Sequence, residues 1–238
     1  MLSAYSCVIL YGSAVPMLTF FCSAVNQGHC HPAIIQTLVT QAQKLTLSSR
    51  AFYNSVFGRF AETITSLFGY DMVLPMNTGA EAVETAIKLS RKWAYERKGV
   101  PEGRAIVLSV KDNFHGRTLG VISMSTDPES RGGFGPYLAN VGPTFKDGEE
   151  TRTIRFGEVE DVRRVLELYG KDVAAFLVEP IQGEAGYVNL LPPTCQMLIR
   201  NYRIVVPPKG YLAEVQKLCK QHNVLLICDE IQTVRQAR

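Results

Sequence analysis

The feature that most constrains the fold is a set of three short β-rich runs in which almost every residue is apolar. They cover residues 105–110, 174–178 and 224–228. Strands buried on both faces of a parallel sheet have this near-continuous apolar pattern, whereas strands with one solvated face alternate. Because helical patterns separate the runs, we predict an α/β domain with a mostly parallel sheet flanked by helices.

Five segments have apolar residues at helical spacing. The predicted helices cover residues 32–44, 58–68, 80–97, 159–169 and 211–222. Gly69 and Gly99 follow two of them, and glycine commonly stands just after a helix end. The glycine- and proline-rich stretch 131–143 predicts a long loop.

Composition excludes several classes of function. The chain has 238 residues, 20% of them charged, and a net charge of +3 that is spread along the sequence. We therefore expect one domain, or one domain plus a fragment, and no nucleic-acid partner. The six cysteines have no C-x-x-C spacing, which favours a reducing compartment, the cytoplasm.

The N-terminal segment is unusually apolar. No charged residue precedes Lys44, and residues 7–25 are almost all apolar or small. A signal peptide would carry a basic region before its apolar stretch, and Pro16 interrupts a possible membrane span. We expect no membrane association.

Four motifs with chemically useful residues follow short apolar runs. The first is Asn77-Thr78-Gly79-Ala80, directly before a predicted helix. Backbone N–H groups at a helix start bind phosphate, and a glycine there allows close approach. The same pattern is typical of a plain N-cap, and the motif alone does not decide between the two.

The second motif is Asp229, at the end of the run 224–228. Ligands of α/β folds bind at the carboxyl ends of the strands, and a carboxylate there can pair with a protonated pyridinium nitrogen. An aspartate in this place can equally cap the next segment or bind magnesium.

The third motif contains Phe114, His115 and Arg117, after the run 105–110. An aromatic pair at a strand end can stack on a planar ring, and a guanidinium can hold a carboxylate with two hydrogen bonds. A surface turn with a solvated arginine is the alternative. Zinc binding is not expected, because His115 has no partner at ligand spacing and the adjacent residues of the cluster 28–32 cannot converge on one ion.

The fourth motif is the glycine-rich segment 179–186, in which Glu184 can pair with an arginine, contact a substrate or be solvated. Each motif is weak by itself. Together they supply partners for a phosphate, a ring, a pyridinium and a carboxylate, which are the parts of a pyridoxal 5′-phosphate pocket.

A family resemblance rests on five stretches in the same order. They are Asn-Gln-Gly-His-Cys-His-Pro (26–32), Leu-Pro-Met-Asn-Thr-Gly-Ala-Glu-Ala (74–82), Asp-Asn-Phe-His-Gly-Arg-Thr (112–118), Glu-Pro-Ile-Gln-Gly-Glu-Ala-Gly (179–186) and Cys-Asp-Glu-Ile-Gln-Thr (228–233). The chain resembles the class III aminotransferases, and within them the ornithine aminotransferases. This resemblance implies part of the large domain of a fold-type I, aspartate aminotransferase-like transferase.

The resemblance also implies residue roles. Thr78, Gly79 and Ala80 would hold the phosphate of pyridoxal phosphate. Phe114 would stack on its ring with His115 beside it, Asp229 would pair with the ring nitrogen, and Gln232 would contact the ring oxygen. The substrate-binding residues would be Tyr5, Arg117 and Glu184, of which Arg117 would take the carboxylate of the 2-oxo acid.

Family members act as homodimers that move the δ-amino group of ornithine to 2-oxoglutarate. Small-molecule amino-acid and 2-oxo-acid substrates are therefore the implied partners. Two alternatives remain: another class III activity on acetylornithine or 4-aminobutyrate, and a non-catalytic fragment that binds a full-length subunit.

The chain departs from the family pattern in three places. Residues 7–23 separate Tyr5-Ser6 from Ala24-Val25, residues 187–203 are inserted after Gly186, and a glycine-rich continuation is not found after Thr233. We expect an N-terminal segment 1–23, a partial cofactor-binding domain 24–238 and no small C-terminal domain. The hypothesis that these are translated introns is tested by sequencing spliced transcripts, and genuine loop insertions are the alternative.

In the family, the Schiff-base lysine lies well downstream of the strand that ends in Asp229. Lys209, Lys217 and Lys220 all precede that strand here, so we assign no catalytic residue. Covalent catalysis needs this amine as anchor and proton shuttle. We therefore expect the 238-residue polypeptide to be inactive on its own.

Overall fold

The computed structural model describes residues 28–49, 51–185 and 204–233. The chain divides into two compact units, residues 1–76 and 77–238. The first contains helices α1 (Pro32–Ala42) and α2 (Phe57–Phe68), which confirm two predicted helices; neither has a buried residue. Gly69 ends α2 in the left-handed conformation, with φ 71°.

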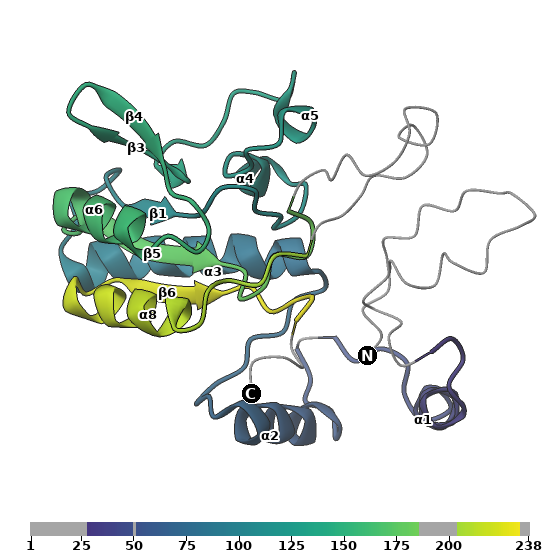
Figure 1. Ribbon diagram of the computed structural model, residues 1–238. Helices are drawn as coiled ribbons and strands as arrows, with labels where there is room; N and C mark the ends of the chain where they lie inside the picture. Colours follow the sequence, from purple (N-terminus) through teal and green to yellow (C-terminus); the bar gives the residue numbers. More distant parts are fainter. Residues whose placement is uncertain (1–27, 50, 186–203, 234–238) are drawn as a thin grey trace, which may run out of the picture. The chain divides into compact units, whose positions relative to one another are not determined.

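A four-stranded sheet forms the centre of the second unit (Figure 1). Its strands are β1 (Ile106–Leu108), β2 (Val141–Gly142), β5 (Val173–Val178) and β6 (Leu225–Cys228), in the order β2-β1-β5-β6. All three strand pairs are parallel, with Leu108 opposite Phe176 and Val178 opposite Cys228. The predicted parallel sheet and its three apolar strands are confirmed.

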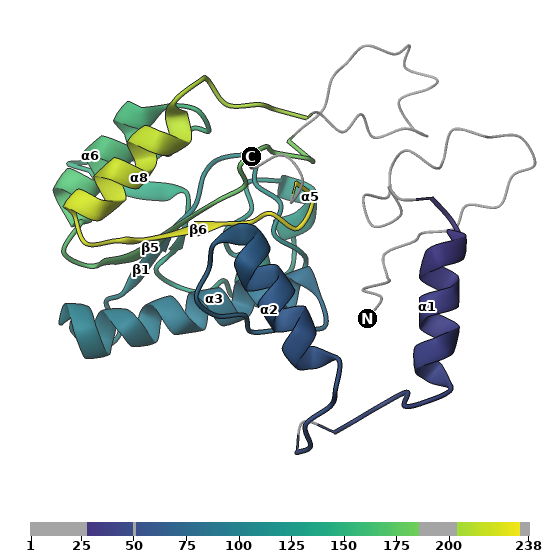
Figure 2. The same cartoon turned by 90° about the horizontal axis from the view of Figure 1, so that it is seen from below.

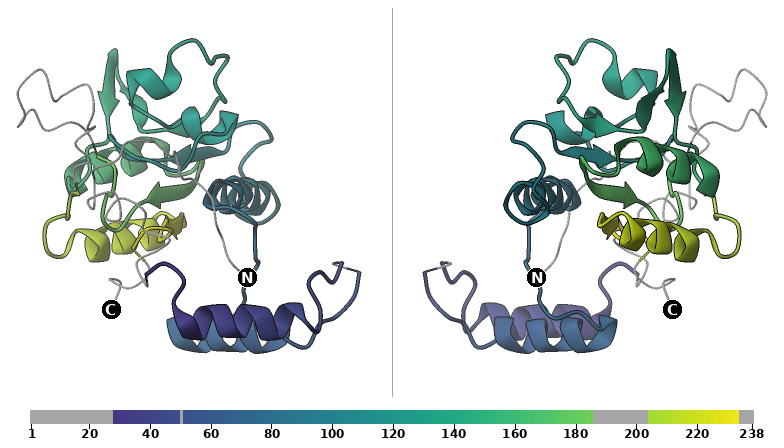
Figure 3. Two further views of the ribbon diagram at one scale, coloured as in Figure 1. Left: turned by 90° about the vertical axis from the view of Figure 1, so that its right-hand side faces the viewer. Right: turned by 90° about the vertical axis from the view of Figure 1, so that its left-hand side faces the viewer.

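Helices cover both faces of this sheet. Helix α3 (Gly79–Trp93) packs on one face, and α6 (Val159–Tyr169) and α8 (Tyr211–Gln221) pack on the other (Figures 2 and 3). Successive side chains of β5 point to opposite faces of the sheet, and helices cover both faces, so the whole strand is buried. Phe176 and Val178 belong to the core under α6 and α8, whereas Ala175 and Leu177 belong to the core under α3.

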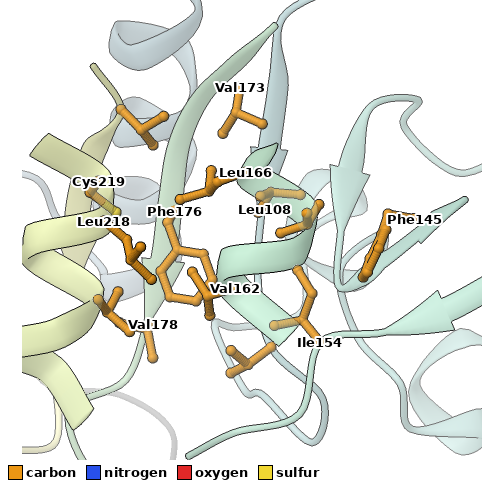
Figure 4. Close-up of a cluster of buried hydrophobic side chains, with 14 of the residues drawn as sticks. Leu108, Phe145, Ile154, Val162, Leu166, Val173, Phe176, Val178, Leu218 and Cys219 are labelled. Atoms are coloured by element: carbon orange, nitrogen blue, oxygen red, sulfur yellow. The ribbon is translucent and has the colours of Figure 1, made fainter. Parts of the chain in front are cut away.

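The core under α6 and α8 is built around the Phe176 ring (Figure 4). Val162 and Leu166 reach it from α6, and Leu218 and Cys219 reach it from α8. All five side chains are at most 3% exposed. Cys219 is a free thiol that packs as a small apolar residue, as its place in the sequence predicts.

The helix predicted over residues 80–97 changes character at its end. After Trp93, which packs partly buried against the core under α3, residues Ala94–Lys98 form a π-helix (η3) that stops at Gly99, φ 81°. The Lys98 ammonium donates to the carbonyl oxygens of Gly170 (2.7 Å), Val173 (2.7 Å) and His222 (3.1 Å). It thus links the ends of α6 and α8 to the start of β5.

The sequence did not predict four short elements. They are α4 (Leu119–Ile122), α5 (Pro128–Arg131) and the antiparallel hairpin of β3 (Thr144–Asp147) and β4 (Glu150–Thr153). The loop prediction for 131–143 is wrong at both ends, because Arg131 belongs to α5 and β2 pairs with β1. The Asp147 carboxylate joins the hairpin to α6 by accepting from Arg152 and Arg164, and these hydrogen bonds hold its pKa well below the usual value.

Several predictions concern parts of the chain outside the described residues. Tyr5 and the predicted insertions 7–23 and 187–203 are among them. Over the three described ranges, no helix has both the length and the apolar character needed to cross a membrane.

Candidate functional site

The candidate site lies where strands β1, β5 and β6 end. Because these strands are parallel, their carboxyl ends meet at one edge of the sheet. The loops that follow cover residues 109–118, 179–185 and 229–233, and we call them the strand-end loops. They contain every predicted cofactor- and substrate-binding residue except Tyr5 and the three residues at the start of α3.

The start of α3 has the geometry of an anion site and of a cap at once. Thr78 Oγ1 accepts from Glu81 N (3.1 Å), and the Glu81 carboxylate accepts from Asn77 N (2.9 Å) and Thr78 N (3.0 Å). This capping box confirms the N-cap interpretation for the Thr78 oxygen. The first amides of the helix, those of Gly79 and Ala80, have no acceptor within the helix and are available to an anion.

Two close contacts hold the start of α3 against the strand-end loops. A Cβ atom added to Gly116 would lie 2.8 Å from Ala80 Cβ, and one added to Gly79 would lie 2.6 Å from Ile231 Cδ1. The loop after β1 and the loop after β6 therefore both touch the first turn of α3. Glycine is needed at 116 for this approach and for its φ of +118°.

Replacing Gly116 with alanine is expected to destabilise the protein by about 2–3 kcal/mol, because strain at positive φ adds to a steric clash. Gly133→Ala is the matched control, because Gly133 also has positive φ (+78°) but open space around it. Denaturant unfolding of both variants measures the difference. Equal losses in the two would show that the contact with Ala80 yields without cost.

His115 and Asp229 form a buried pair between the loops after β1 and β6. His115 Nδ1 lies 2.7 Å from Asp229 Oδ2, and the two side chains are 0% and 5% exposed. Nδ1 and this carboxylate oxygen share one hydrogen bond, and the second ring nitrogen, Nε2, is not part of it. Nε2 is buried and has no partner among the described residues. Asp229 Oδ1 accepts from Ile231 N at 3.2 Å.

Arg117 lies against the ring of Phe114, with its Cζ atom 5.6 Å from the ring centroid. Its Nη1 donates to Ser130 Oγ at 3.2 Å, and Ser130 Oγ donates to Asp127 Oδ2 at 2.6 Å. The guanidinium thus has contacts on two sides, and Arg117 lines an open groove of about 1070 Å³ together with Glu84, Leu119 and Phe134. Arg117 is exposed, as the alternative of a solvated arginine predicts, but its guanidinium also has the contacts with Ser130 and Phe114.

Glu184 and Gln232 contact each other across the loops after β5 and β6. Gln232 Nε2 donates to Glu184 Oε1 at 3.2 Å. Burial raises the pKa of Glu184, and the hydrogen bond from Gln232 and the nearby charge of Arg117 oppose that shift. The partner of Glu184 in this structure is therefore an amide, not the arginine that the sequence suggested as one possibility.

Three polar residues with defined contacts in the site were not predicted. Glu179 accepts from the Phe114 amide (3.0 Å), and Gln182 Nε2 donates to Lys111 O (2.8 Å). The Glu84 carboxylate accepts from Thr118 Oγ1 and lies against Gly120. Glu179 and Gln182 do lie in a motif at a strand end, and this was the only signal for them in the sequence. Their contacts could not be predicted, because their partners lie 65 and 71 residues away.

Comparisons with known proteins point to one family. A family model described as aminotransferase class-III matches residues 17–200. The ornithine aminotransferase of Schizosaccharomyces pombe is 58% identical over 211 residues, which are 89% of this chain and 44% of that protein. The chain therefore spans less than half the length of this relative.

Solved structures that resemble the chain include other aminotransferases. An ornithine aminotransferase from Toxoplasma gondii, described with partial occupancy of pyridoxal phosphate at its active site, has a TM-score of 0.74 and 42% identity over 89% of this chain and 43% of its own. An acetylornithine aminotransferase from Elizabethkingia anophelis has a TM-score of 0.66 and 45% identity over 90% of this chain and 45% of its own.

Proposed function

The chain belongs to the class III aminotransferase family, and from this membership we propose that the protein transfers the δ-amino group of ornithine to 2-oxoglutarate. The products would be glutamate 5-semialdehyde and glutamate. The observation that supports ornithine most strongly is the 58% identity with an ornithine aminotransferase over 89% of the chain.

Pyridoxal phosphate is the cofactor of this family, and the residues present fit it. The start of α3 offers amides to a phosphate, and the orphaned Nε2 of buried His115 marks a polar place beside Asp229 that no described residue fills. When bound, the cofactor supplies an electron sink for the bond broken at the amine-bearing carbon.

The cofactor-binding roles follow from this placement. Thr78, Gly79 and Ala80 would hold the phosphate at the start of α3, where the helix dipole favours an anion. Asp229 would keep a proton on the ring nitrogen, and His115 fixes the orientation of that carboxylate by its hydrogen bond at 2.7 Å. Phe114 would stack on the ring, and Gln232 would contact the ring oxygen.

The substrate-binding roles centre on Arg117 and Glu184. Arg117 takes a substrate carboxylate, because Ser130 and the Phe114 ring hold its guanidinium at the wall of an open groove. Glu184 helps the site to accept two different amino acids in turn, with Tyr5 as a further contact. Release of the hydrogen bond between Gln232 and Glu184 would free both side chains for ligands.

Substrate profiling of the whole protein that contains this chain tests the proposal. We expect ornithine to be the preferred amino donor, with glutamate 5-semialdehyde formed in proportion to glutamate. Acetylornithine is the second candidate, because an acetylornithine aminotransferase shares 45% identity and the same fold. A preference for acetylornithine or 4-aminobutyrate over ornithine would overturn the substrate assignment and leave the family unchanged.

Association of two copies is part of the proposal. The groove beside Arg117 is lined by Leu119 and Phe134, which are 70% and 56% exposed, and α1 and α2 have no buried residue. Exposed apolar surface of this kind marks interaction sites. Analytical ultracentrifugation distinguishes a homodimer from a monomer, and co-purification with a longer family member would favour the non-catalytic alternative.

We place this activity in the cytoplasm. The three cysteines in the described part of the chain are free thiols, which suits a reducing compartment. Microscopy of the fluorescently tagged whole protein tests this, and a mitochondrial signal would contradict it.

A further inference from the structure

Glu179 is a buried carboxylate to which the proposed function gives no role. It is the first residue after β5, and only 4% of its surface is exposed. Oε2 accepts from Phe114 N at 3.0 Å, and Oε1 accepts from Gly183 N at 3.5 Å. These two amides belong to different strand-end loops, the one after β1 and the one after β5.

Among the described residues, a second hydrogen bond joins these two loops, from Gln182 Nε2 to Lys111 O, and the charges of Arg117 and Glu184 also interact across them. That hydrogen bond lies near the start of the loop after β1, three residues before Phe114. The Phe114 amide itself is held by Glu179. Removal of the carboxylate would therefore release the Phe114 amide, while Asn113 keeps its bonds to Val110 O and Met124 O and His115 keeps its bond to Asp229.

We infer that Glu179 is a positioning residue of the cofactor site: its carboxylate fixes the Phe114–His115 segment to the Gly183–Glu184 segment. The ring-stacking phenyl and the Glu184–Gln232 pair then keep a constant separation. The effect on cofactor binding rests on the proposed function, whereas the link between the two loops is a property of the protein without cofactor.

The electrostatic surroundings of Glu179 supply a distinctive signature. Burial raises the pKa of Glu179 to about 7, and the charge of Asp229 acts in the same direction. The charge of His115 and the two amide donors act in the opposite direction. His115 and Asp229 are the charged groups that face it from the loops after β1 and β6, while Glu184 of its own loop bonds to Gln232. A buried carboxyl whose pKa is raised stabilises the fold below its ordinary pKa of 4.5, and this contribution is lost as the pH rises through about 7.

The first experiment measures amide hydrogen exchange in the protein without cofactor. Glu179→Met keeps the side-chain length but removes both acceptors, so exchange at Phe114 and Gly183 is expected to become about 10-fold faster, the loss of one net hydrogen bond. The Ser109 amide, which donates to Gly142 O in the sheet, is the internal reference. Glu214→Gln, an exposed helix substitution, is the control variant.

The second experiment follows thermal unfolding between pH 5 and pH 8. Relative to Glu179→Gln, the wild-type protein is expected to lose stability over this range, because only the wild type has an ionisable side chain at position 179, whereas both proteins have Asp229. A constant difference between the two proteins would show that the pKa of Glu179 is not raised in the folded protein, and the exchange rates at Phe114 and Gly183 then decide the positioning role. The wild-type exchange rates at Phe114 and Gly183, measured against Ser109 over the same range, give the same information if a variant does not fold.

The third experiment titrates each protein with pyridoxal phosphate and follows its absorbance. Glu179→Met is expected to bind about 10-fold more weakly than the wild type. If the wild type binds no cofactor but the exchange and pH results hold, the proposed function fails and the link stands. If the cofactor binds and Glu179 variants change neither exchange nor the pH dependence, the positioning role is refuted.

Discussion

Replacing Asp229 with asparagine is expected to lower kcat for transamination by about 10²–10³-fold, the usual effect of removing one preorganised electrostatic contact. The amide has nearly the same shape but no charge, so it cannot hold a proton on the ring nitrogen. His115 Nδ1 and Ile231 N bond to different oxygens of the carboxylate, so the single amide oxygen of asparagine can serve only one of them in the same geometry. Circular dichroism and thermal unfolding of the variant therefore check that the loop after β6 keeps its conformation. Steady-state kinetics of the whole protein measure the loss.

Glu230→Gln is the matched control for this substitution. Glu230 is the next carboxylate in the same loop, and it accepts from Thr233 Oγ1 at 2.6 Å outside the proposed machinery. This variant should keep kcat within about twofold, as expected of a substitution that touches no reacting group. An asparagine variant with normal kcat would show that Asp229 does not pair with the ring nitrogen.

Replacing Lys98 with methionine is expected to destabilise the protein by about 2–3 kcal/mol, because three backbone carbonyls lose a charged donor. The loss is partly offset, since burial of the ammonium lowers the pKa of Lys98 and so already disfavours the charged form. For a protein of this size the change corresponds to a fall in Tm of about 5–10 °C. Calorimetry or thermal circular dichroism measures it.

Lys92→Met controls for the loss of a lysine from the same helical segment. Among the described residues Lys92 forms an exposed ion pair with Glu96, at 3.5 Å, and such pairs contribute little to stability. Its Tm should stay within about 2 °C of the wild type. An equal Tm for Lys98→Met and Lys92→Met would contradict the prediction and would show that water can replace the ammonium at the three carbonyls without loss of stability.

The central sheet was predictable because β5 is buried on both faces, β1 nearly so, and β6 is continuously apolar although only partly buried. Residues such as Val107 and Phe176 belong to continuous apolar runs in the sequence, because helices pack against each face of the sheet. Helices α6 and α8 were predictable for a related reason: each buries one apolar stripe on that sheet.

Elements that are stabilised by distant or polar partners have no comparable apolar pattern in the sequence. In the β3–β4 hairpin Phe145 is buried, and much of the rest is polar; Asp147 joins it to α6 through Arg164, 17 residues away. Strand β2 has two residues and exists because Val141 pairs with Val107. No local pattern reports pairings of this kind.

For the site, the sequence indicated the residues but not their contacts. The strand-end positions of Phe114, His115 and Asp229 predicted that they would gather at one sheet edge, and the 2.7 Å contact confirms that two of them touch. The hydrogen bond between Glu184 and Gln232 joins residues 48 apart in the sequence, and the carboxylate of Glu179 reaches a backbone amide. Backbone amides are the same in every residue, so such contacts cannot be inferred from residue types.

Helix α3 also separates the proposed phosphate site from a natural fluorophore by a fixed distance. It begins at Gly79, where the phosphate is proposed to bind, and it ends at Trp93, the only tryptophan of the chain. A straight helix of 15 residues spans about 21 Å between these ends, because each residue rises 1.5 Å. Indole fluorescence should therefore be quenched by energy transfer to pyridoxal phosphate at the other end, and its recovery would report release of the cofactor in real time.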